Sequence, residues 1–501
     1  KPDSPLPRRV LPPTRRRTSE TAMQHLTYQT LEGTLDALSH ETLEAFAQHI
    51  RGGVLTEADP GYDKARAVWN GMVDRHPALI AHCLGTQDVR HAVDFARTHQ
   101  IRVSIRGGGH HIAGNAVADR GMVIDLSRMR SVHVNAHEHT ARVEAGALLG
   151  DVDHETQAFG LAVPLGINST TGVAGLCLGG GFGWLTRKYG MTIDNLLSAE
   201  IVTANGQLHD VSATQEPELF WALRGGGGNF GVVTSFEFKL HPVGPLVYAG
   251  LVVYPLAQAE QVLQAWRDHA AIAPREFSVW TVLRQAPPLP FLPESAHGQP
   301  VVVFALLYAG DPAAGEREAA KVLGYGSPLG HMLGTQPYAS FQTAFDPLLV
   351  PGARNYWKTQ NFQQVPNDLL DVLIDAAQAL PGPECEIFVA QLGGAAGEIG
   401  DTDTAYAGRD ANFVMNVHGR WRDPAEDERV RNWSRQVFDT TAPFATGGGY
   451  INFLTEDEAL RTDTIYGLNY PRLQQIKYQY DPANLFRLNQ NILPVPLAKS
   501  A

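Results

Sequence analysis

Three glycine-dense segments between residues 106 and 231 constrain this chain more than any other feature. They read RGGGHH at 106–111, GVAGLCLGGGFG at 172–183 and RGGGGNFG at 224–231. The first follows an apolar, β-branched run at 101–105, which predicts a buried strand. Consecutive glycines let the backbone approach a ligand and turn several N–H groups in one direction, which suits a pyrophosphate. A single loop of this kind has the alternative of a tight surface turn, whereas three together indicate a large, flat cofactor that carries phosphate.

The third segment also matches the dinucleotide fingerprint Gly-x-Gly-x-x-Gly, at residues 226–231. That fingerprint needs a strand before it and a helix after it, because the helix N-terminus receives the pyrophosphate. Here residues 232–240 alternate between apolar and polar side chains and predict a strand. The sequence therefore excludes a Rossmann-type site at this position.

Five motifs in a fixed order identify a family resemblance. They are Arg-x-Gly-Gly-His at 106–110, the glycine-rich stretch at 172–183, Tyr-Gly-x-x-x-Asp-Asn at 189–195, Gly-Gly-Gly-Asn-Phe-Gly at 226–231, and Tyr-Asp-Pro-x-Asn-x-Phe-x-x-Asn-x-Asn-Ile-x-Pro at 480–494. The series resembles the vanillyl-alcohol-oxidase superfamily with its PCMH-type FAD-binding domain. Within that superfamily it resembles the berberine-bridge-enzyme-like oxidases and their bacterial branch around 6-hydroxynicotine oxidase. The resemblance implies an α+β fold of two domains, one that binds FAD and one with an antiparallel sheet that binds the substrate.

The chain divides into four parts on this basis. Residues 1–22 are basic and proline-bearing, and we expect a disordered extension there. We expect the FAD-binding domain at 23–245, the substrate domain at 246–445, and at 446–499 a C-terminal segment that returns to the FAD domain. The turn-rich sequence His-Pro-Val-Gly-Pro at 241–245 marks the boundary between the two domains.

Periodicity predicts the secondary structure of both domains. Residues 24–75 look mainly helical. Later in the first domain, strands are predicted at 78–83, 101–105, 122–125, 132–134, 141–144, 201–204, 208–211 and 232–240, and helices at 86–99 and 148–159. In the second domain, strands are predicted at 248–253, 278–283, 301–308, 385–392 and 413–421, and helices at 256–272, 314–322 and 366–379.

One departure from the family pattern concerns how the flavin is held. The resemblance implies that His110 is joined covalently to the 8α carbon of the flavin. Many relatives add a second bond, from the cysteine of Gly-x-Cys-x-x-[Val/Leu]-Gly, but Asn168 occupies that place here. Cys177 lies nine residues further on and is not its substitute. We therefore predict FAD held by one covalent bond.

The cofactor-binding residues implied by the resemblance form a larger set. They are Arg106, Gly107, Gly108, Gly109, His110, His111, Gly114, Thr171, Gly172, Gly175, Gly179, Gly180, Gly181, Gly183, Val202, Val233, Asn452, Asn489 and Asn491. His111 has the alternative of a solvated loop histidine. No metal is expected, because the three cysteines are far apart and show no ligand spacing.

A second departure concerns the substrate base. Relatives often carry Tyr-x-Asn-Tyr near the C-terminus, and its last tyrosine can act as a base, but residues 450–453 read Tyr-Ile-Asn-Phe. Phenylalanine cannot accept a proton, so the base is absent or replaced. The candidates are Tyr450, Gln391, Asn416, His418 and Tyr406, with Tyr356 as a further one. Asn416 and His418 share one face of their strand, because strand side chains alternate. For each candidate, a structural hydrogen bond is the alternative role.

Composition limits the partners and the location. The formal net charge is −12, and an acidic protein is a poor partner for nucleic acid. No stretch of about 18 uncharged apolar residues is present, so no membrane span is expected. No apolar core follows the N-terminal arginines, so a secretory signal is not expected and cytoplasmic residence is predicted.

These features together predict an FAD-dependent oxidase. It would take hydride from a CH–OH or CH–N group of a small organic substrate and reduce molecular oxygen to hydrogen peroxide. Thr171 stands where relatives carry the residue thought to gate oxygen, so a dehydrogenase with another acceptor is an alternative. A tailoring enzyme of secondary metabolism is a second alternative, which Phe453 favours over sugar oxidation, and a flavin-binding protein without turnover is the last. The sequence does not indicate the oligomeric state.

Overall fold

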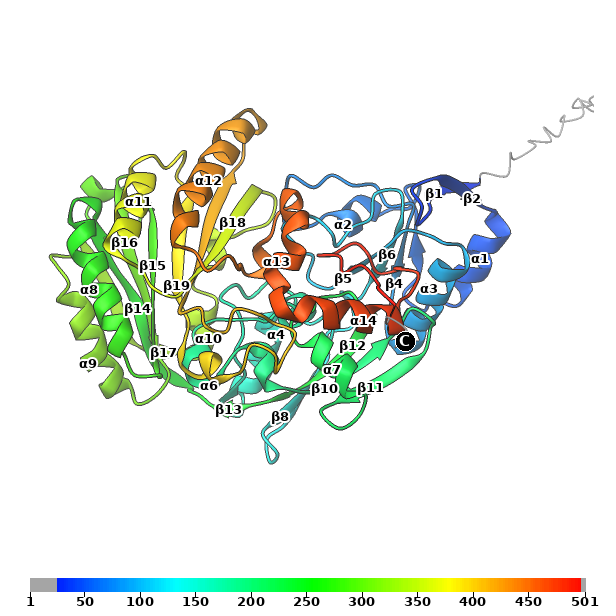
Figure 1. Cartoon of the computed structure of the whole chain (residues 1–501), viewed down its shortest axis with the longest axis horizontal. Helices are drawn as coiled ribbons and strands as arrows, with labels where there is room; N and C mark the ends of the chain where they lie inside the picture. Colours follow the sequence, from blue (N-terminus) through cyan, green and yellow to red (C-terminus); the bar gives the residue numbers. More distant parts are fainter. Residues whose placement is uncertain (1–24, 497–501) are drawn as a thin grey trace, which may run out of the picture.

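Two lobes make up the computed structural model, which describes residues 25–496 (Figure 1). The first lobe holds a four-stranded and a five-stranded sheet, and the second holds one seven-stranded sheet. This two-domain α+β arrangement is the fold class predicted from the sequence. The extension predicted at residues 1–22 lies outside the described residues.

The four-stranded sheet positions the first glycine-rich loop. β4 (Leu79–His82), β6 (Met122–Asp125) and β5 (Val103–Arg106) run parallel, and the short β3 (Val54–Leu55) pairs with β4 antiparallel. Every residue of β4 and β6 is buried, as is typical of parallel strands covered on both faces. The glycine loop begins at Gly107, directly after the carboxyl end of β5. Ligands of α/β sheets bind at this end of the strands.

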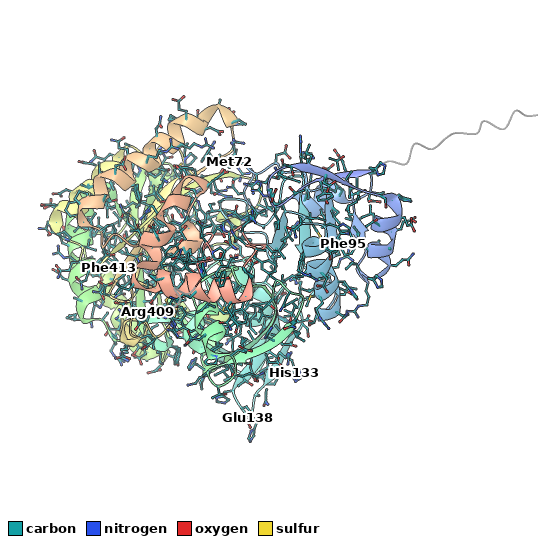
Figure 2. All side chains as sticks on the ribbon, turned by 45° about the vertical axis from the view of Figure 1, so that its right-hand side comes forward. Met72, Phe95, His133, Glu138, Arg409 and Phe413 are labelled. Atoms are coloured by element: carbon teal, nitrogen blue, oxygen red, sulfur yellow. The ribbon has the colours of Figure 1, made fainter. Side chains whose placement is uncertain are left out.

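The five-stranded sheet is antiparallel and follows the order β11–β10–β12–β8–β7. Its strands are β7 (Val132–Asn135), β8 (Thr140–Glu144), β10 (Leu196–Val202), β11 (Leu208–Ser212) and β12 (Val232–Lys239). The further elements of this lobe are α3 (Thr86–Thr98), α4 (Leu149–Gln157), β9 (Leu161–Ala162), α5 (Val173–Leu178), α6 (Thr186–Tyr189), α7 (Pro217–Leu223) and β13 (His241–Pro242). The β7–β8 hairpin projects from the lobe and carries Glu138 near its tip (Figure 2).

The N-terminal segment differs from its prediction. Residues 24–75 are not mainly helical, since they contain the hairpin of β1 (Leu26–Gln29) and β2 (Leu35–Leu38) before α1 (His40–Gln48) and α2 (Tyr62–Arg66). The turn between β1 and β2 puts Gly33 at a φ of 85°, which glycine adopts at little cost. That glycine is the turn signal that an all-helical assignment overlooks.

The seven-stranded sheet of the second lobe is antiparallel and follows the order β17–β14–β16–β15–β19–β20–β18. Its strands are β14 (Leu246–Pro255), β15 (Phe277–Gln285), β16 (Pro300–Tyr308), β17 (Gly330–Pro337), β18 (Arg354–Phe362), β19 (Glu386–Gln391) and β20 (Phe413–Trp421). Four helices cover one face (Figure 1): α8 (Ala259–Ile272), α9 (Pro312–Leu323), α11 (Asn367–Gln378) and α12 (Asp427–Thr441). The opposite face of the sheet meets the first lobe. The helix α10 (Tyr338–Gln342) also contacts that lobe. All nine residues of β20 are buried, because both faces of the sheet are covered.

Two strands of this sheet have no counterpart in the prediction. β17 contains two glycines and lies at the sheet edge, so its sequence lacks the β-branched enrichment of a strand. β18 reads RNYWKTQNF and is rich in polar residues, although seven of its nine residues are buried. Several of its polar side chains, such as Thr359 and Gln360, are paired inside the protein, a property that composition does not reveal.

The C-terminal helices connect the two lobes. α13 (Thr462–Tyr466) and α14 (Tyr470–Tyr480) lie between the lobes, and α14 runs toward the first one (Figure 1). Lys477 of α14 donates to the Asn229 carbonyl at 2.7 Å and pairs with Asp481 at 2.6 Å, with both charged side chains fully buried. The end of the chain is thereby fixed against the third glycine-rich loop.

Candidate active site

One cavity lies where three parts of the chain meet. The glycine-rich loops of the first lobe form one wall, the seven-stranded sheet forms another, and residues 450–453 and 488–490 complete it. Of the residues predicted to bind the cofactor, those that line the cavity are Gly107, Gly108, Gly109, His110, His111, Thr171, Gly172, Gly175, Val233, Asn452 and Asn489.

The other residues predicted to bind the cofactor do not line the cavity, and their contact with the cofactor stays a prediction. They are Arg106, Gly114, Gly179, Gly180, Gly181, Gly183, Val202 and Asn491. A Cβ on Gly181 would lie 2.1 Å from Thr192 Oγ1, and one on Gly183 would lie 1.9 Å from the Leu165 carbonyl oxygen. The glycines of this group therefore make room for neighbouring protein atoms.

Two of the glycine-rich loops touch through their backbones. A Cβ on Gly108 would lie 2.4 Å from the amide nitrogen of Gly172, and a Cβ on Gly172 would meet the Gly108 nitrogen at the same distance. Within residues 25–496, the amides of Gly107, Gly108 and Gly109 donate to no protein acceptor. The first loop thus presents free N–H groups beside the cavity, as a phosphate-bearing ligand requires.

His110 is a partly buried side chain of this wall. Its ring stacks on Trp69 with centroids 5.2 Å apart and an interplanar angle of 21°. Burial lowers the pKa of His110 to about 4, although the contact with Thr170 opposes this shift. The imidazole is therefore neutral near pH 7, with a lone pair on one ring nitrogen.

The hydrogen bonds around His110 decide which nitrogen holds that lone pair. Asn168 Oδ1 accepts from the Thr170 amide at 3.0 Å and from Thr170 Oγ1 at 2.7 Å. The Thr170 hydroxyl has only one proton, so its contact with His110 Nε2 at 3.0 Å requires the ring to donate. His110 consequently carries its proton on Nε2, and its lone pair lies on Nδ1, 3.5 Å from Thr171 Oγ1.

Aromatic side chains form the opposite wall. Trp357 of β18 lies across from His418 of β20, and the two rings stack at 4.3 Å with an angle of 11°. Phe388 of β19 packs edge-on against His418, and Phe453 packs edge-on against Trp357. No Asp, Glu, Lys or Arg is among the described residues that line the cavity. The space between the walls is therefore uncharged and suits flat, apolar groups.

Two family models match the chain. The family described as FAD binding domain matches residues 77–212, and the family described as berberine and berberine like matches residues 449–493. An FAD-linked oxidoreductase from Dictyostelium discoideum is 32% identical over 460 residues, which are 91% of this chain and 97% of that protein. The chain belongs to the berberine-bridge-enzyme-like family of FAD-linked oxidoreductases.

Other members of the family show the same similarity. (R)-6-hydroxynicotine oxidase from Paenarthrobacter nicotinovorans is 30% identical over 475 residues, which are 89% of this chain and 97% of that protein. The solved structure of 6-hydroxy-D-nicotine oxidase from Arthrobacter nicotinovorans superposes with a TM-score of 0.79 and 28% identity, covering 88% of this chain and 98% of that one.

The cavity fits the FAD of this family. Besides the free glycine amides, three buried polar atoms of the C-terminal segment have no protein partner within the described part of the chain, namely Asn489 Oδ1, Gln490 Nε2 and Asn491 Oδ1. Native proteins rarely leave such groups unpaired, so these atoms mark the place of a polar ligand. The chain thus provides both the backbone donors and the side-chain partners that the cofactor of a berberine-bridge-like enzyme needs.

Only one predicted base both lines the cavity and has a ring nitrogen without a partner among the described residues. His418 lines the cavity and is 5% exposed, and its Nε2 has no partner among the described residues. Asn416 shares its strand face as expected, but it is fully buried and does not line the cavity. Tyr450 lines the cavity with its ring, but its hydroxyl oxygen already accepts from the Gly181 amide and from Asn452, each at 3.0 Å. Burial also raises the pKa of Tyr450, which makes it a poor base.

Three further candidates do not line the cavity. Gln391 lies on the helix-covered face of the sheet and donates to the Ala270 carbonyl at 2.8 Å, because an odd spacing from Phe388 turns it away from the cavity. Tyr356 lies on that same face and donates to Asp457 at 2.6 Å. Tyr406 does not line the cavity, since its ring packs beside Gly180 behind the cavity wall.

Several lining residues were not predicted. Trp280 and Phe388 lie on predicted strands, where period-two alternation is a signal, but the sequence does not tell which face meets the cofactor domain. Trp357 lies on β18, which was not predicted at all.

No helix within residues 25–496 is both long and apolar enough to cross a membrane.

Proposed function

We propose that this chain is an FAD-dependent oxidase whose flavin is attached by one covalent bond to His110. The observation that carries the proposal is the partly buried, neutral imidazole of His110 at the mouth of a glycine loop with free amides. Its Nδ1 lone pair is the nucleophile that a bond to carbon requires. Asn168 supports the attachment indirectly. Its side chain orients the Thr170 hydroxyl, which accepts a hydrogen bond from His110 Nε2.

A second covalent bond is not part of the proposal. Asn168 lines the cavity at the place where many relatives carry a cysteine, and an amide cannot form a thioether. Cys177 is fully buried in α5 and does not line the cavity. Burial also raises the pKa of its thiol, so the reactive thiolate is disfavoured.

The proposed reaction divides the work between cofactor and protein. The bound flavin supplies the hydride acceptor for a C–H bond beside oxygen or nitrogen and the route of those electrons to molecular oxygen, which yields hydrogen peroxide. The protein excludes water with its aromatic walls and orients a flat small-molecule substrate between them. His418 Nε2 accepts the proton of the substrate O–H or N–H.

A dehydrogenase or tailoring enzyme is the second candidate, favoured by Thr171 in the cavity wall and by Phe453 in place of a tyrosine. Release of peroxide during turnover separates an oxidase from a dehydrogenase.

Cytoplasmic location and domains at 23–245, 246–445 and 446–499 remain part of the proposal. The buried free thiols of all three cysteines support the location, and β14 as first strand of the seven-stranded sheet supports the boundary at 245.

Substitution of His110 with alanine is expected to abolish covalent attachment. The wild-type protein should retain yellow colour in an acid-precipitated pellet, with the flavin mass on a single peptide that contains His110. The His110→Ala pellet should be colourless, although the folded variant still binds FAD through the glycine loops. Cys177→Ala is the control and should keep the full covalent yield. Flavin mass on a Cys177 peptide, or a wild-type pellet without flavin, contradicts the proposal.

A further inference from the structure

Glu386 connects His418 to an arginine within the seven-stranded sheet. The two residues lie directly across from each other on β19 and β20, and Glu386 Oε1 lies 3.2 Å from His418 Nδ1. The second carboxylate oxygen, Oε2, accepts from Arg284 Nη1 at 2.7 Å, and Arg284 lies across from Glu386 on β15. Three neighbouring strands therefore place arginine, carboxylate and imidazole in one row that ends at the cavity.

The row determines which nitrogen of His418 carries the proton and which is the acceptor. A carboxylate has no proton to give, so the contact at Nδ1 requires the ring to donate from that nitrogen. The proton of neutral His418 then lies on Nδ1, and the lone pair lies on Nε2, which has no partner among the described residues. Stacking on Trp357 and edge contact with Phe388 fix the plane of the ring.

The charge of Glu386 persists although only 14% of its side chain is exposed. Burial alone would raise the pKa of Glu386, but attraction to Arg284 and the hydrogen bond from His418 lower it to about 2. The charged groups around the row are Arg284 on β15 and Arg420 on β20, and the titratable groups across the cavity are His110, His111 and Tyr450. An ionised carboxylate beside Nδ1 favours the protonated ring that proton abstraction produces.

We propose that Glu386, held by Arg284, is a positioning residue that presents His418 Nε2 to the substrate as a proton acceptor. This inference rests on the proposed function for the reaction itself. In the step assigned to these residues, the substrate O–H or N–H bond breaks and leaves its electron pair on the heteroatom. A new N–H bond forms at His418 Nε2, and the positive charge on the ring is balanced by Glu386. The site therefore selects substrates that carry an ionisable O–H or N–H beside the reacting C–H.

The tautomer of His418 tests the inference without turnover. Holoenzyme labelled with ¹⁵N-histidine should show His418 as the Nδ1–H tautomer, with its signals identified by their absence in His418→Gln. In Glu386→Gln, Arg284 retains the amide oxygen, so the NH₂ group faces Nδ1 and the Nε2–H tautomer should dominate. A wild-type ring protonated at Nε2 overturns the inference, and this outcome does not depend on the behaviour of Glu386→Gln.

Glu384→Gln is the matched control. Glu384 lies two residues from Glu386 and pairs with Arg420 and Arg422, at 3.1 and 2.7 Å. Glu384→Gln removes the same charge beside the row but keeps the contact between Glu386 and His418. It should therefore leave the His418 tautomer unchanged. A shift of equal size in both variants overturns the positioning role of Glu386.

Activity provides the second readout. Glu386→Gln should lower kcat by about 10²–10⁴-fold with little change in KM, because the wrong tautomer cannot accept a proton. The acidic limb of the pH profile of kcat should lie at lower pH in Glu386→Gln than in the wild type. A variant with wild-type kcat and pH profile overturns the inference. If the wild-type ring shows the Nδ1–H tautomer but no oxidation of any substrate is found, the proposed function fails and the row stands.

Discussion

Replacement of His418 with glutamine is expected to lower the kcat of substrate oxidation by about 10²–10⁴-fold, the usual contribution of a positioned general base. His418 has the only free proton acceptor among the predicted bases that line the cavity. Glutamine has similar reach and keeps a polar head beside Glu386, but its amide cannot take a proton near neutral pH. Flavin content should stay at the wild-type level, because His418 lies on the wall opposite His110. Anaerobic bleaching of the flavin by substrate measures the rate of the affected step directly.

His269→Gln provides a matched control for this prediction. His269 is also a buried histidine with a carboxylate partner, since its Nε2 lies 3.2 Å from Glu318 Oε2. It belongs to α8, on the helix-covered face of the same sheet, and does not line the cavity. The control should change kcat by less than about twofold even where it lowers Tm. A His418→Gln enzyme that retains more than a tenth of the wild-type kcat contradicts the role of His418 as the base.

Local patterns predict much of the fold. The runs at 122–125 and 301–308 coincide with β6 and β16 to within one residue, because continuous apolar runs form strands covered on both faces. The helix predicted at 86–99 ends within one residue of α3. Prediction fails where stability comes from partners distant in sequence. The polar strand β18 is the main example, since Thr359 and Gln360 are satisfied by carbonyl groups of β20 and α12.

In the candidate site, too, local motifs are predictable from the sequence and contacts between distant segments are not. Glycine loops and His110 are recognisable from the sequence, because their chemistry is local to one motif. The choice among the predicted bases is not local. Gln391 and His418 both lie on predicted strands, and only the packing of the two lobes decides that one faces the helices and the other the cavity. Glu386 carries no signal at all, since a carboxylate on a strand is typical of a solvent-facing position, and its partner Arg284 is 102 residues away.

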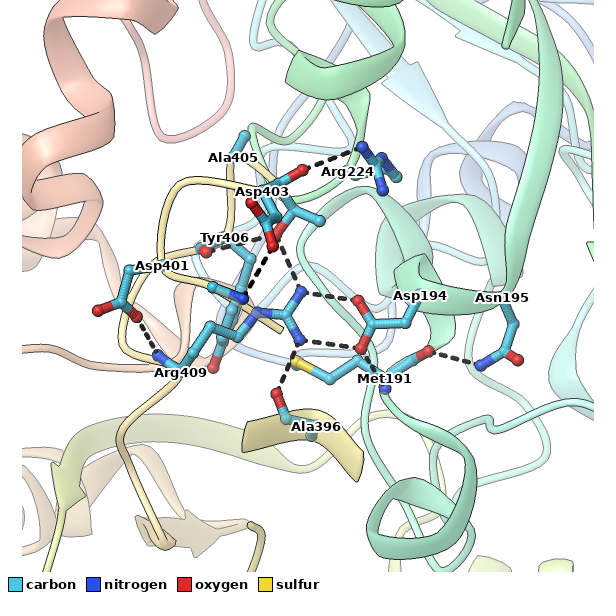
Figure 3. Close-up of polar contacts among 12 residues, drawn as sticks. Met191, Asp194, Asn195, Arg224, Ala396, Asp401, Asp403, Ala405, Tyr406 and Arg409 are labelled. Atoms are coloured by element: carbon cyan, nitrogen blue, oxygen red, sulfur yellow. Dashed lines mark hydrogen bonds and ion pairs between the residues drawn. The ribbon is translucent and has the colours of Figure 1, made fainter. Parts of the chain in front are cut away.

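A buried ion pair joins the lobes behind the cavity (Figure 3). Arg409, from the segment between β19 and β20, donates to both carboxylate oxygens of Asp194 in the first lobe, at 2.7 and 2.9 Å. The side chains are 3% and 6% exposed. Arg409 also donates to Thr404 Oγ1 at 2.9 Å, and Asp194 accepts from the Met191 amide at 2.8 Å. Asp194 thus holds a turn through the Met191 amide and also forms an ion pair that the sequence did not indicate.

Arg409→Ala is expected to lower the free energy of unfolding by about 3–5 kcal/mol, because it leaves the Asp194 carboxylate buried without a counter-charge. Scanning calorimetry should record this loss as a lower Tm. The control is Arg429→Ala, which removes an exposed pair with Glu426 one helical turn away and should cost less than about 1 kcal/mol.

A double variant separates the effect of the unpaired Asp194 carboxylate on stability from the effect of the lost packing. Arg409→Met with Asp194→Asn keeps an acceptor for the Met191 amide and an apolar stem in place of the arginine, but leaves no charge in the interface. Because the larger part of the penalty comes from the unpaired carboxylate, this double variant should be more stable than Arg409→Ala alone. Equal Tm values for Arg409→Ala and the exposed control would show that water reaches Asp194 and that the pair does not hold the lobes together.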